Sequence, residues 1–209
     1  MKPFNEFVKK GNTSIGLFPG AFKPPHKGHF ETVKRAALEN NKVVVLISAI
    51  DRDGITVANS SAIWNIYKSY LPKNVTMQVV GGSPVTAIYQ IVDILNNGQF
   101  TPTPRSAAPL PDAQSIGDTL LTEKLPTSIK LYASKEDMGR YNAFFEPEKS
   151  RIYKGRNVSN IEKGEVVRIA SATEARQALK EKNYEKFQTY LPKITKEDKL
   201  QVYKMLTHE

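Results

Sequence analysis

Cysteine is absent from the 209 residues of this chain. That absence excludes disulfide bonds, thiolate zinc sites and cysteine nucleophiles. Long apolar runs are missing too: the longest uncharged one, residues 43–50, is far shorter than the roughly 20 residues that cross a bilayer. Residues 1–10 lack the continuous apolar core of a signal peptide. We therefore expect a cytoplasmic protein without a membrane partner.

Clustered positive charge is also absent, although the formal net charge is +9. The basic residues are spread along the chain, with no arginine-rich block and no interleaving with aromatic residues. Small phosphorylated substrates account for the positive sign as well as a nucleic acid would. A nucleic-acid partner is therefore not the expectation.

Short runs of β-branched residues alternate with amphipathic segments of helical length, and no internal repeat interrupts them. The expected strands are 14–18, 42–48, 74–80, 128–133 and 165–169, and the expected helices are 28–40, 62–71 and 84–96. Asn59, Ser60 and Ser61 are expected to cap the second helix. The alternation predicts an α/β fold, a Rossmann-like parallel five-stranded sheet with helices on both faces and a helical C-terminal tail.

One stretch interrupts the alternation. Residues 101–126 hold five prolines and little periodicity, so we expect a loop or insertion at about 98–127, either a lid or an excursion without structure. From Ala172 onward the pattern is helical, ending in a capped helix at 195–208. The expected domain covers residues 1–181, and the extension 182–209 packs on the sheet or makes a contact in a homo-oligomer.

Residues 20–29 connect the first strand to its helix at the sheet edge where parallel sheets bind ligands. His26 and His29 lie one helical turn apart at the helix N-terminus, and Gly28 between them leaves room for a phosphate. Two alternatives are a simple capped turn or a metal site. A metal would need a third protein ligand, and the remaining histidine is His208 at the end of the chain. We therefore expect an anion site and no protein-bound metal.

A second anion site is indicated after the expected fifth strand. Ser171 and Thr173 open a helix, and Arg176 follows in its first turn. Hydroxyls and free N–H groups at that end, with a fixed cation beside them, suit the oxygens of a triphosphate. Taken alone, Ser-Ala-Thr-Glu is an ordinary capping box.

The two segments together resemble a known family. Gly-Ala-Phe-Lys-Pro-Pro-His-Lys-Gly-His at 20–29 is similar to the GxFxPxHxGH signature of the HxGH-motif nucleotidyltransferase superfamily, and residues 169–176 resemble its ISSTxxR motif. Ala170 and Ala172 depart from the second motif, which puts one side-chain contact in doubt. The resemblance covers residues 14–179 apart from the proline-rich insertion.

The resemblance implies that an acceptor phosphate attacks the α-phosphorus of a nucleoside triphosphate and releases pyrophosphate, with Mg²⁺ carried by the triphosphate. The catalytic residues that it implies are His26, His29, Lys23 and Arg176. Expected nucleotide contacts are Gly20, Ala21, Phe22, Gly28, Ser134, Lys135, Asp137, Ser171 and Thr173. Arg52 and Trp64 are expected to contact the acceptor, although a lone tryptophan on an amphipathic helix is more often a core residue.

Within the superfamily, the form of the histidine motif most resembles nicotinamide or nicotinate mononucleotide adenylyltransferases. This implies NAD synthesis from ATP and a phosphorylated small-molecule acceptor. Cytidylyl transfer from CTP to a sugar or polyol phosphate is the alternative. A nucleotide-sensing or RNA-binding module without turnover is the alternative from another class. Class I aminoacyl-tRNA synthetases share a HIGH-type motif, but they need a KMSKS-like loop and a longer chain.

Overall fold

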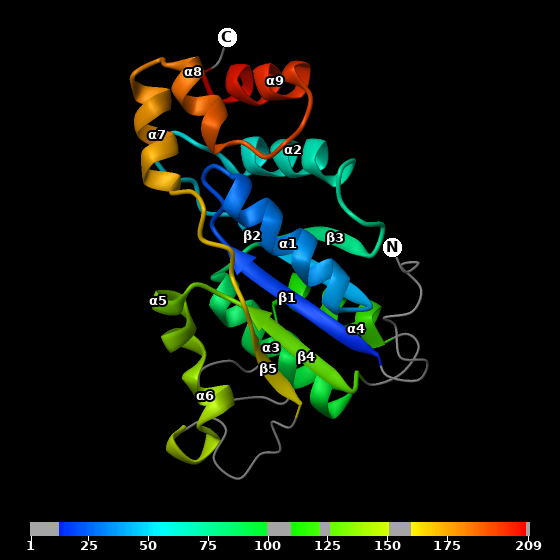
Figure 1. The fold of residues 1–209 in the computed structure, drawn as a ribbon. Helices are drawn as coiled ribbons and strands as arrows, with labels where there is room; N and C mark the ends of the chain where they lie inside the picture. Colours follow the sequence, from blue (N-terminus) through cyan, green and yellow to red (C-terminus); the bar gives the residue numbers. More distant parts are fainter. Residues whose placement is uncertain (1–12, 100–109, 122–125, 151–159, 208–209) are drawn as a thin grey trace.

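The computed structural model describes residues 13–99, 110–121, 126–150 and 160–207. Its centre is a five-stranded parallel sheet in the order β3-β2-β1-β4-β5 (Figure 1). The strands are β1 (Ser14–Gly20), β2 (Lys42–Ser48), β3 (Val75–Val80), β4 (Ser128–Tyr132) and β5 (Ile161–Gly164). The α/β class, the parallel sheet and its flanking helices are therefore as the sequence predicts.

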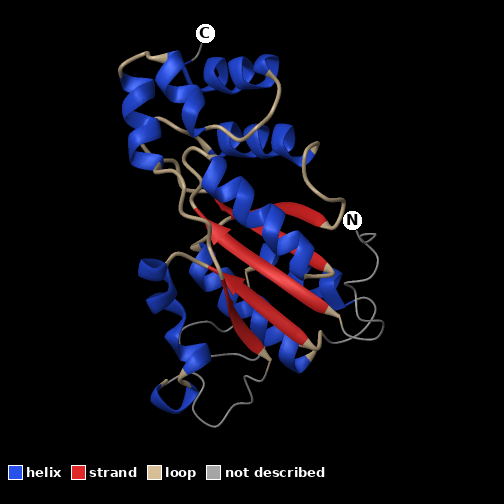
Figure 2. Cartoon of the chain, viewed as in Figure 1, coloured by secondary structure: helices blue, strands red, loops and turns tan. Residues whose placement is uncertain are grey.

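Helices cover both faces of the sheet (Figures 1 and 2). The helices α1 (Lys27–Glu39) and α2 (Val57–Lys68) pack on one face, and α3 (Pro84–Asn97) and α4 (Pro111–Leu121) on the other. The strands supply both cores because successive side chains point to opposite faces. In β2, Val43 and Val45 join the first core while Val44 and Leu46 join the second.

Two groups of short helices complete the chain. After β4 come α5 (Lys135–Met138), η2 (Gly139–Tyr141), α6 (Asn142–Phe145) and η3 (Pro147–Lys149). After β5 come α7 (Ala172–Lys180), α8 (Tyr184–Phe187), η4 (Gln188–Tyr190) and α9 (Lys196–Thr207). Figure 1 shows α7, α8 and α9 gathered with α2 beyond the carboxyl end of β1. Phe187, Val202 and Tyr203 are buried in the same core as α2. A division of the chain near residue 181 stays a prediction.

Three boundaries differ from the sequence prediction. The fifth strand is Ile161–Gly164 and not 165–169, because β4 ends at Tyr132 and offers no partner beyond Gly164. The second helix begins at Val57, five residues before the expected start, because Thr56 and Asn59 form a reciprocal capping box there. The segment predicted as a loop at 101–126 contains α4, whose Ala113, Ile116 and Leu120 are buried. Residues 100–109 and 122–125 lie outside the described part of the chain.

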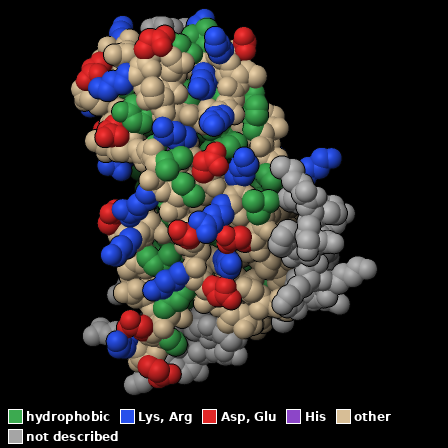
Figure 3. Space-filling model, viewed as in Figure 1, with side chains coloured by type: hydrophobic (Ala, Val, Ile, Leu, Met, Phe, Trp, Pro, Cys, Tyr) green, Lys and Arg blue, Asp and Glu red, His purple; other side chains and the backbone are tan. Residues whose placement is uncertain are grey.

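The surface carries mixed charge. On the face shown in Figure 3, Lys and Arg side chains are interspersed with Asp and Glu and do not form one basic patch. No described helix combines the length and apolar character that spanning a bilayer requires.

Candidate active site

The β1–α1 loop, residues 21–26, is held tightly at the carboxyl end of β1. Phe22 has a positive φ of 53°, and its carbonyl accepts a hydrogen bond from Ser60 Oγ at 2.9 Å. The Tyr67 hydroxyl donates to the Pro25 carbonyl at 3.3 Å, so α2 fixes the loop at two points. A Cβ at Gly20 would lie 2.6 Å from the Phe22 ring, which explains glycine at that position. The peptide bond Lys23–Pro24 is cis.

The two motif histidines lock each other in place at the start of α1. His26 is the N-cap residue, and its Nδ1 accepts the N–H groups of Gly28 at 3.2 Å and His29 at 3.4 Å. In return, the His26 N–H donates to His29 Nδ1 at 3.3 Å. The rings are stacked, with centroids 3.6 Å apart. This reciprocal bonding satisfies N–H groups that every helix N-terminus leaves free.

These bonds also fix the protonation of both rings. Because each Nδ1 accepts a hydrogen bond, the proton of the neutral ring sits on Nε2. Burial lowers the pKa of His26 to about 4, and the charge of Lys27 acts in the same direction. Burial, and then the neighbouring His26, hold the pKa of His29 well below its usual value. Both histidines are therefore neutral Nε2–H donors near pH 7.

A cavity of about 380 Å³, the central cavity, opens beside this loop. Loops that follow β1, β2 and β4 form it together with the start of α7. His29, Lys23 and Arg176 line it, whereas His26 lies behind His29 and is only 7% exposed. The complete lining is Phe18, Pro19, Gly20, Ala21, Phe22, Lys23, His29, Arg52, Ser134, Glu136, Asp137, Val166, Ala172, Thr173 and Arg176.

Three contacts hold Arg176 in the wall of the central cavity. Its Nε lies 2.9 Å from an oxygen of Asp53, Nη1 donates to the Lys23 carbonyl at 2.8 Å, and Nη2 donates to Thr173 Oγ1 at 3.3 Å. Arg176 is the fifth residue of α7 and so stands in its second turn, one turn later than expected. It nevertheless meets the histidine loop, from which it is separated by about 150 residues of sequence.

Lys23 turns away from open solvent. Its side chain is 2% exposed, and Nζ donates to the Ser48 carbonyl at 3.2 Å, which ties the loop to the end of β2. Burial lowers the pKa of Lys23, and the nearby carboxylate of Asp51 opposes this shift. The lysine therefore places a cation in the cavity wall and acts as a brace at the same time.

A second cavity, of about 530 Å³, adjoins the first. The two share the backbone ridge Pro19, Gly20 and Ala21, and also Arg52 and Asp137. The remaining lining residues of the second cavity are Ser48, Ile50, Asp51, Ser83, Pro84, Val85, Ala133, Arg140 and Tyr141. Arg52 thus stands where the two cavities meet.

The residues after β4 are divided between cavities. Ser134 caps α5 and donates to Asp137 Oδ2 at 2.9 Å, and both residues line the central cavity. Lys135 instead lines a third cavity of about 480 Å³, at the carboxyl ends of β4 and β5, together with Lys163 and Arg168. Val166 lines both cavities, so the third lies next to the first.

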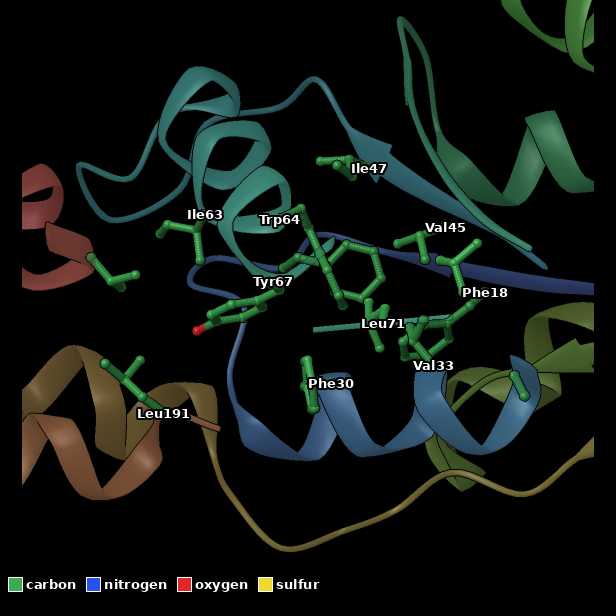
Figure 4. Packing of buried hydrophobic residues seen from close by; sticks show 14 of the residues in the cluster. Phe18, Phe30, Val33, Val45, Ile47, Ile63, Trp64, Tyr67, Leu71 and Leu191 are labelled. Carbon is green, nitrogen blue, oxygen red and sulfur yellow. The ribbon is translucent and has the colours of Figure 1, made fainter. Parts of the chain in front are cut away.

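Besides His26, three of the expected site residues line none of these three cavities, namely Trp64, Gly28 and Ser171. Trp64 is fully buried, with its ring against Phe22 at 5.3 Å and Tyr67 at 5.7 Å. Figure 4 shows Trp64 and Tyr67 projecting from α2 into the space between α1 and the sheet. In this structure Trp64 is a core residue with no face exposed for stacking on an acceptor ring.

Gly28 and Ser171 have structural roles at the starts of α1 and α7. A Cβ at Gly28 would lie 3.0 Å from the Val167 carbonyl oxygen, so glycine lets the segment before α7 cross the start of α1. Ser171 is the N-cap of α7, and its hydroxyl accepts the Glu174 N–H at 3.4 Å. Gly20, Ala21, Phe22 and Thr173 do line the central cavity.

Three residues that the sequence interpretation did not select also belong to the site. Glu136 lines the central cavity, Arg140 lines the second, and Asp53 pairs with Arg176. Asp-Gly after a buried strand predicts a turn. This pattern could have indicated that residues 53–54 project a side chain at this edge of the sheet. No local pattern indicates that Asp53 meets a residue of α7.

No group of three or more His, Asp or Glu side chains capable of holding a metal ion occurs among the described residues. Glu136 and Asp137 do supply carboxylate oxygens to the central cavity, and such hard donors suit Mg²⁺. The cavity wall therefore carries carboxylates of the kind that bind a divalent cation.

No family model matches the sequence, and no curated protein matches it at a significant level. Solved structures do share the fold. Plasmodium falciparum nicotinic acid mononucleotide adenylyltransferase, complexed with NaAD, is 12% identical with a TM-score of 0.52, over 95% of this chain and 100% of that one. A bifunctional NMN adenylyltransferase/ADP ribose pyrophosphatase from Francisella tularensis, complexed with AMP and a Mn ion, is 16% identical with a TM-score of 0.50.

The match to the Francisella protein covers 94% of this chain but 52% of that one, so this chain spans about half its length. At 12–16% identity these likenesses establish the fold alone. They confirm the fold that the resemblance of the two motifs implies.

Proposed function

We propose that this chain is a nucleotidyltransferase that transfers AMP from ATP to nicotinamide or nicotinate mononucleotide and releases pyrophosphate. The observation that carries the proposal is the meeting of His29, Lys23 and Arg176 in one cavity beside a second cavity. A transfer between two phosphorylated substrates needs such a pair of adjoining sites with cations and N–H donors where they meet.

The triphosphate occupies the central cavity in this proposal. Arg176 and the Thr173 hydroxyl contact the β and γ phosphates, and the N-terminus of α7 directs free N–H groups toward the same anion. Because Thr173 Oγ1 accepts a hydrogen bond from Arg176, its own proton remains available for a phosphate oxygen. The nucleoside extends along Val166 into the third cavity, beside Lys135.

His29 serves the reacting phosphate. Its Nε2–H donates to an oxygen of the α-phosphate, on which charge develops as the acceptor oxygen attacks and the bond to pyrophosphate breaks. The acceptor is already an anion, so no residue has to remove a proton from it. His26 holds the tautomer and orientation of His29 through their paired Nδ1 bonds and stacked rings. Lys23 adds fixed positive charge to the cavity wall.

The carboxylates of Glu136 and Asp137 would hold magnesium carried by the triphosphate, and the ion would offset part of the phosphate charge.

The acceptor occupies the second cavity. Arg52 contacts its phosphate, because that side chain stands where the two cavities meet. The shared ridge Pro19, Gly20 and Ala21 is narrow, with side chains no longer than a proline ring. The acceptor phosphate can therefore approach the α-phosphorus from the side opposite to the leaving group, as in-line displacement requires.

The decisive experiment pairs Mg·ATP or Mg·CTP with separate phosphorylated acceptors and follows pyrophosphate. The acceptors are nicotinamide mononucleotide, nicotinate mononucleotide, phosphopantetheine and glycerol phosphate. We expect release with ATP and a pyridine mononucleotide, with one dinucleotide formed per pyrophosphate. Release with CTP and a polyol phosphate alone would replace the proposal by the cytidylyltransferase. Tight ATP binding without release from any pair would indicate a nucleotide-sensing module instead.

A further inference from the structure

Arg176 has one charged partner in the free protein, among the contacts that the described residues give it. Asp53 Oδ2 lies 2.9 Å from Arg176 Nε, while the other two partners are the neutral Lys23 carbonyl and the Thr173 hydroxyl. The Arg176 side chain is 12% exposed and that of Asp53 is 39% exposed. The aspartate therefore approaches from the solvent side, the direction from which an anionic ligand would also reach the guanidinium.

The turn that carries Asp53 is built to present it. Arg52 and Ile55 exchange two backbone hydrogen bonds, at 3.1 and 2.9 Å, around a tight turn. Asp53 and Gly54 in the middle both have positive φ, 52° and 76°. Asp tolerates this conformation better than most residues. The turn is exposed and closed by its own backbone bonds, so it does not depend on Arg176 to form.

The same turn carries Arg52, which links the two cavities. Arg52 Nε lies 3.5 Å from Asp53 Oδ2, so one carboxylate oxygen serves both arginines. Arg52 lines the central and the second cavity. A substitution at Asp53 therefore affects both Arg52, on the acceptor side, and Arg176, on the triphosphate side.

We propose that the carboxylate of Asp53 stands in for a phosphate on Arg176 until a nucleotide arrives, and competes with that phosphate for the guanidinium. A triphosphate brings more negative charge and more acceptor oxygens than one carboxylate, so it displaces Asp53 from Nε. The displaced turn then carries Arg52, relieved of a shared partner, toward the acceptor phosphate. The inference rests on the proposed function, since it requires a polyphosphate in the central cavity.

The ion pair between Asp53 and Arg176 costs little free energy to break. Lys23 and Thr173 keep the guanidinium in place after Asp53 leaves, so Arg176 does not have to be reoriented. Exchange of a half-exposed carboxylate for a phosphate costs little desolvation compared with a buried pair. Asp53 thereby holds the arginine ready while weakening nucleotide binding by competition.

The test is ATP binding by calorimetry in the presence of Mg²⁺, with Asp53→Asn as the variant. Asn accepts a positive φ as Asp does, so the turn is retained, and Asp53→Gly is a second variant for which this conformation carries no strain. We expect about threefold to tenfold tighter binding in both variants. Asp118→Asn is the control, since it removes an equal charge from the exposed side of α4, on the other face of the sheet, and should change the affinity by less than about twofold.

The same substitution in an Arg176→Gln background decides the mechanism. There the gain should vanish, because the arginine for which Asp53 competes is absent. Weaker or unchanged binding in Asp53→Asn, or an undiminished gain without Arg176, would overturn the inference while pyrophosphate release by the wild type still supported the proposed function. Absence of ATP binding to the wild type and to every variant would contradict both.

Discussion

The two loops that meet at the candidate site are held in opposite ways. In the β1–α1 loop, Phe22, Lys23 and His26 are nearly inaccessible, and the carbonyls of Phe22 and Pro25 are bonded to α2. In the β2–α2 loop, residues 50–54 are all exposed, and the ion pair from Asp53 to Arg176 links this loop to the opposite wall of the central cavity.

The two loops therefore suit two different tasks within one site. Donors aimed at a developing charge act best when the fold fixes them beforehand, which the buried loop does for His29. A loop that must admit one substrate before another has to move at low cost, which an exposed turn can do. The four predictions below test whether the buried loop governs stability and turnover while the exposed loop governs substrate affinity.

The largest expected effect lies beneath the buried loop. Trp64→Ala should lower the free energy of unfolding by about 3–5 kcal/mol, because it leaves a cavity under Phe22 and Tyr67. Chemical denaturation measures it. Trp64→Phe keeps most of the volume and removes a buried indole N–H that has no hydrogen-bond partner among the described residues, so it should cost under about 1.5 kcal/mol. A raised acceptor KM in Trp64→Phe would mean that this side chain touches the acceptor after all.

Loss of the donor in the buried loop comes next. His29→Ala should reduce kcat by about a hundredfold or more, as for other preorganised donors, with a much smaller change in acceptor KM. Steady-state pyrophosphate release measures both constants. His29→Asn is the matched variant, since its side chain can still accept the His26 N–H but places no donor at the position of Nε2. Near-normal turnover in His29→Asn would remove His29 from the chemistry.

Acid should weaken the same loop through His26. Its pKa is lowered to about 4 in the folded chain, so the unfolded chain binds more protons between that value and about 6.5. The contribution of His26 to the free energy of unfolding is therefore fully present above its unfolded-state pKa of about 6.5. It falls as the pH drops through this window, by about 2 kcal/mol between pH 7 and 5.

Denaturation at both pH values measures the fall, and His26→Asn is the comparison. Asn remains a good N-cap but does not titrate, so the fall should shrink in that variant. An equal fall in both proteins would assign the acid sensitivity to other groups.

The smallest expected effect belongs to the exposed loop. Arg52→Gln should raise the acceptor KM about tenfold, with kcat within about twofold and unfolding unchanged, because the side chain is 62% exposed and supports no core contact. Kinetics at varied acceptor concentration measures it, with Arg35→Gln as a control of equal charge on the outer side of α1. A tenfold loss of kcat instead would place Arg52 on the reacting phosphate.

Much of the fold follows from local pattern. The run of Val, Leu and Ile in residues 42–48 is buried on both faces, and the segment becomes a strand at the predicted bounds. The fifth strand was misplaced because Ile161–Gly164 is short and half-polar, and its strand state depends on pairing with β4. The apolar residues that follow leave the sheet for α1, where the Val167 N–H finds the hydroxyl of Thr32 at 2.9 Å.

Part of the geometry of the candidate site was also predictable from the sequence. The spacing of His26 and His29 correctly indicates that the rings lie together, but it does not say which ring reaches the cavity. That outcome follows from helix capping, in which the His26 side chain folds back over the first turn of α1 while His29 lines the cavity. The partner of Arg176 is Asp53, far away in the sequence, and only the packing of α7 beside the end of β2 brings them together.

The strand order has one more consequence. β1 lies between β2 and β4, and the chain reaches β2 through α1 on one face but arrives at β4 after α3 and α4 on the other. The crossovers diverge at the tip of β1 and leave a crevice there, the topological switch point of an open parallel sheet. That crevice is made by the route of the backbone. Exchanges of the side chains along its walls would therefore change which ligand enters and leave the opening itself in place.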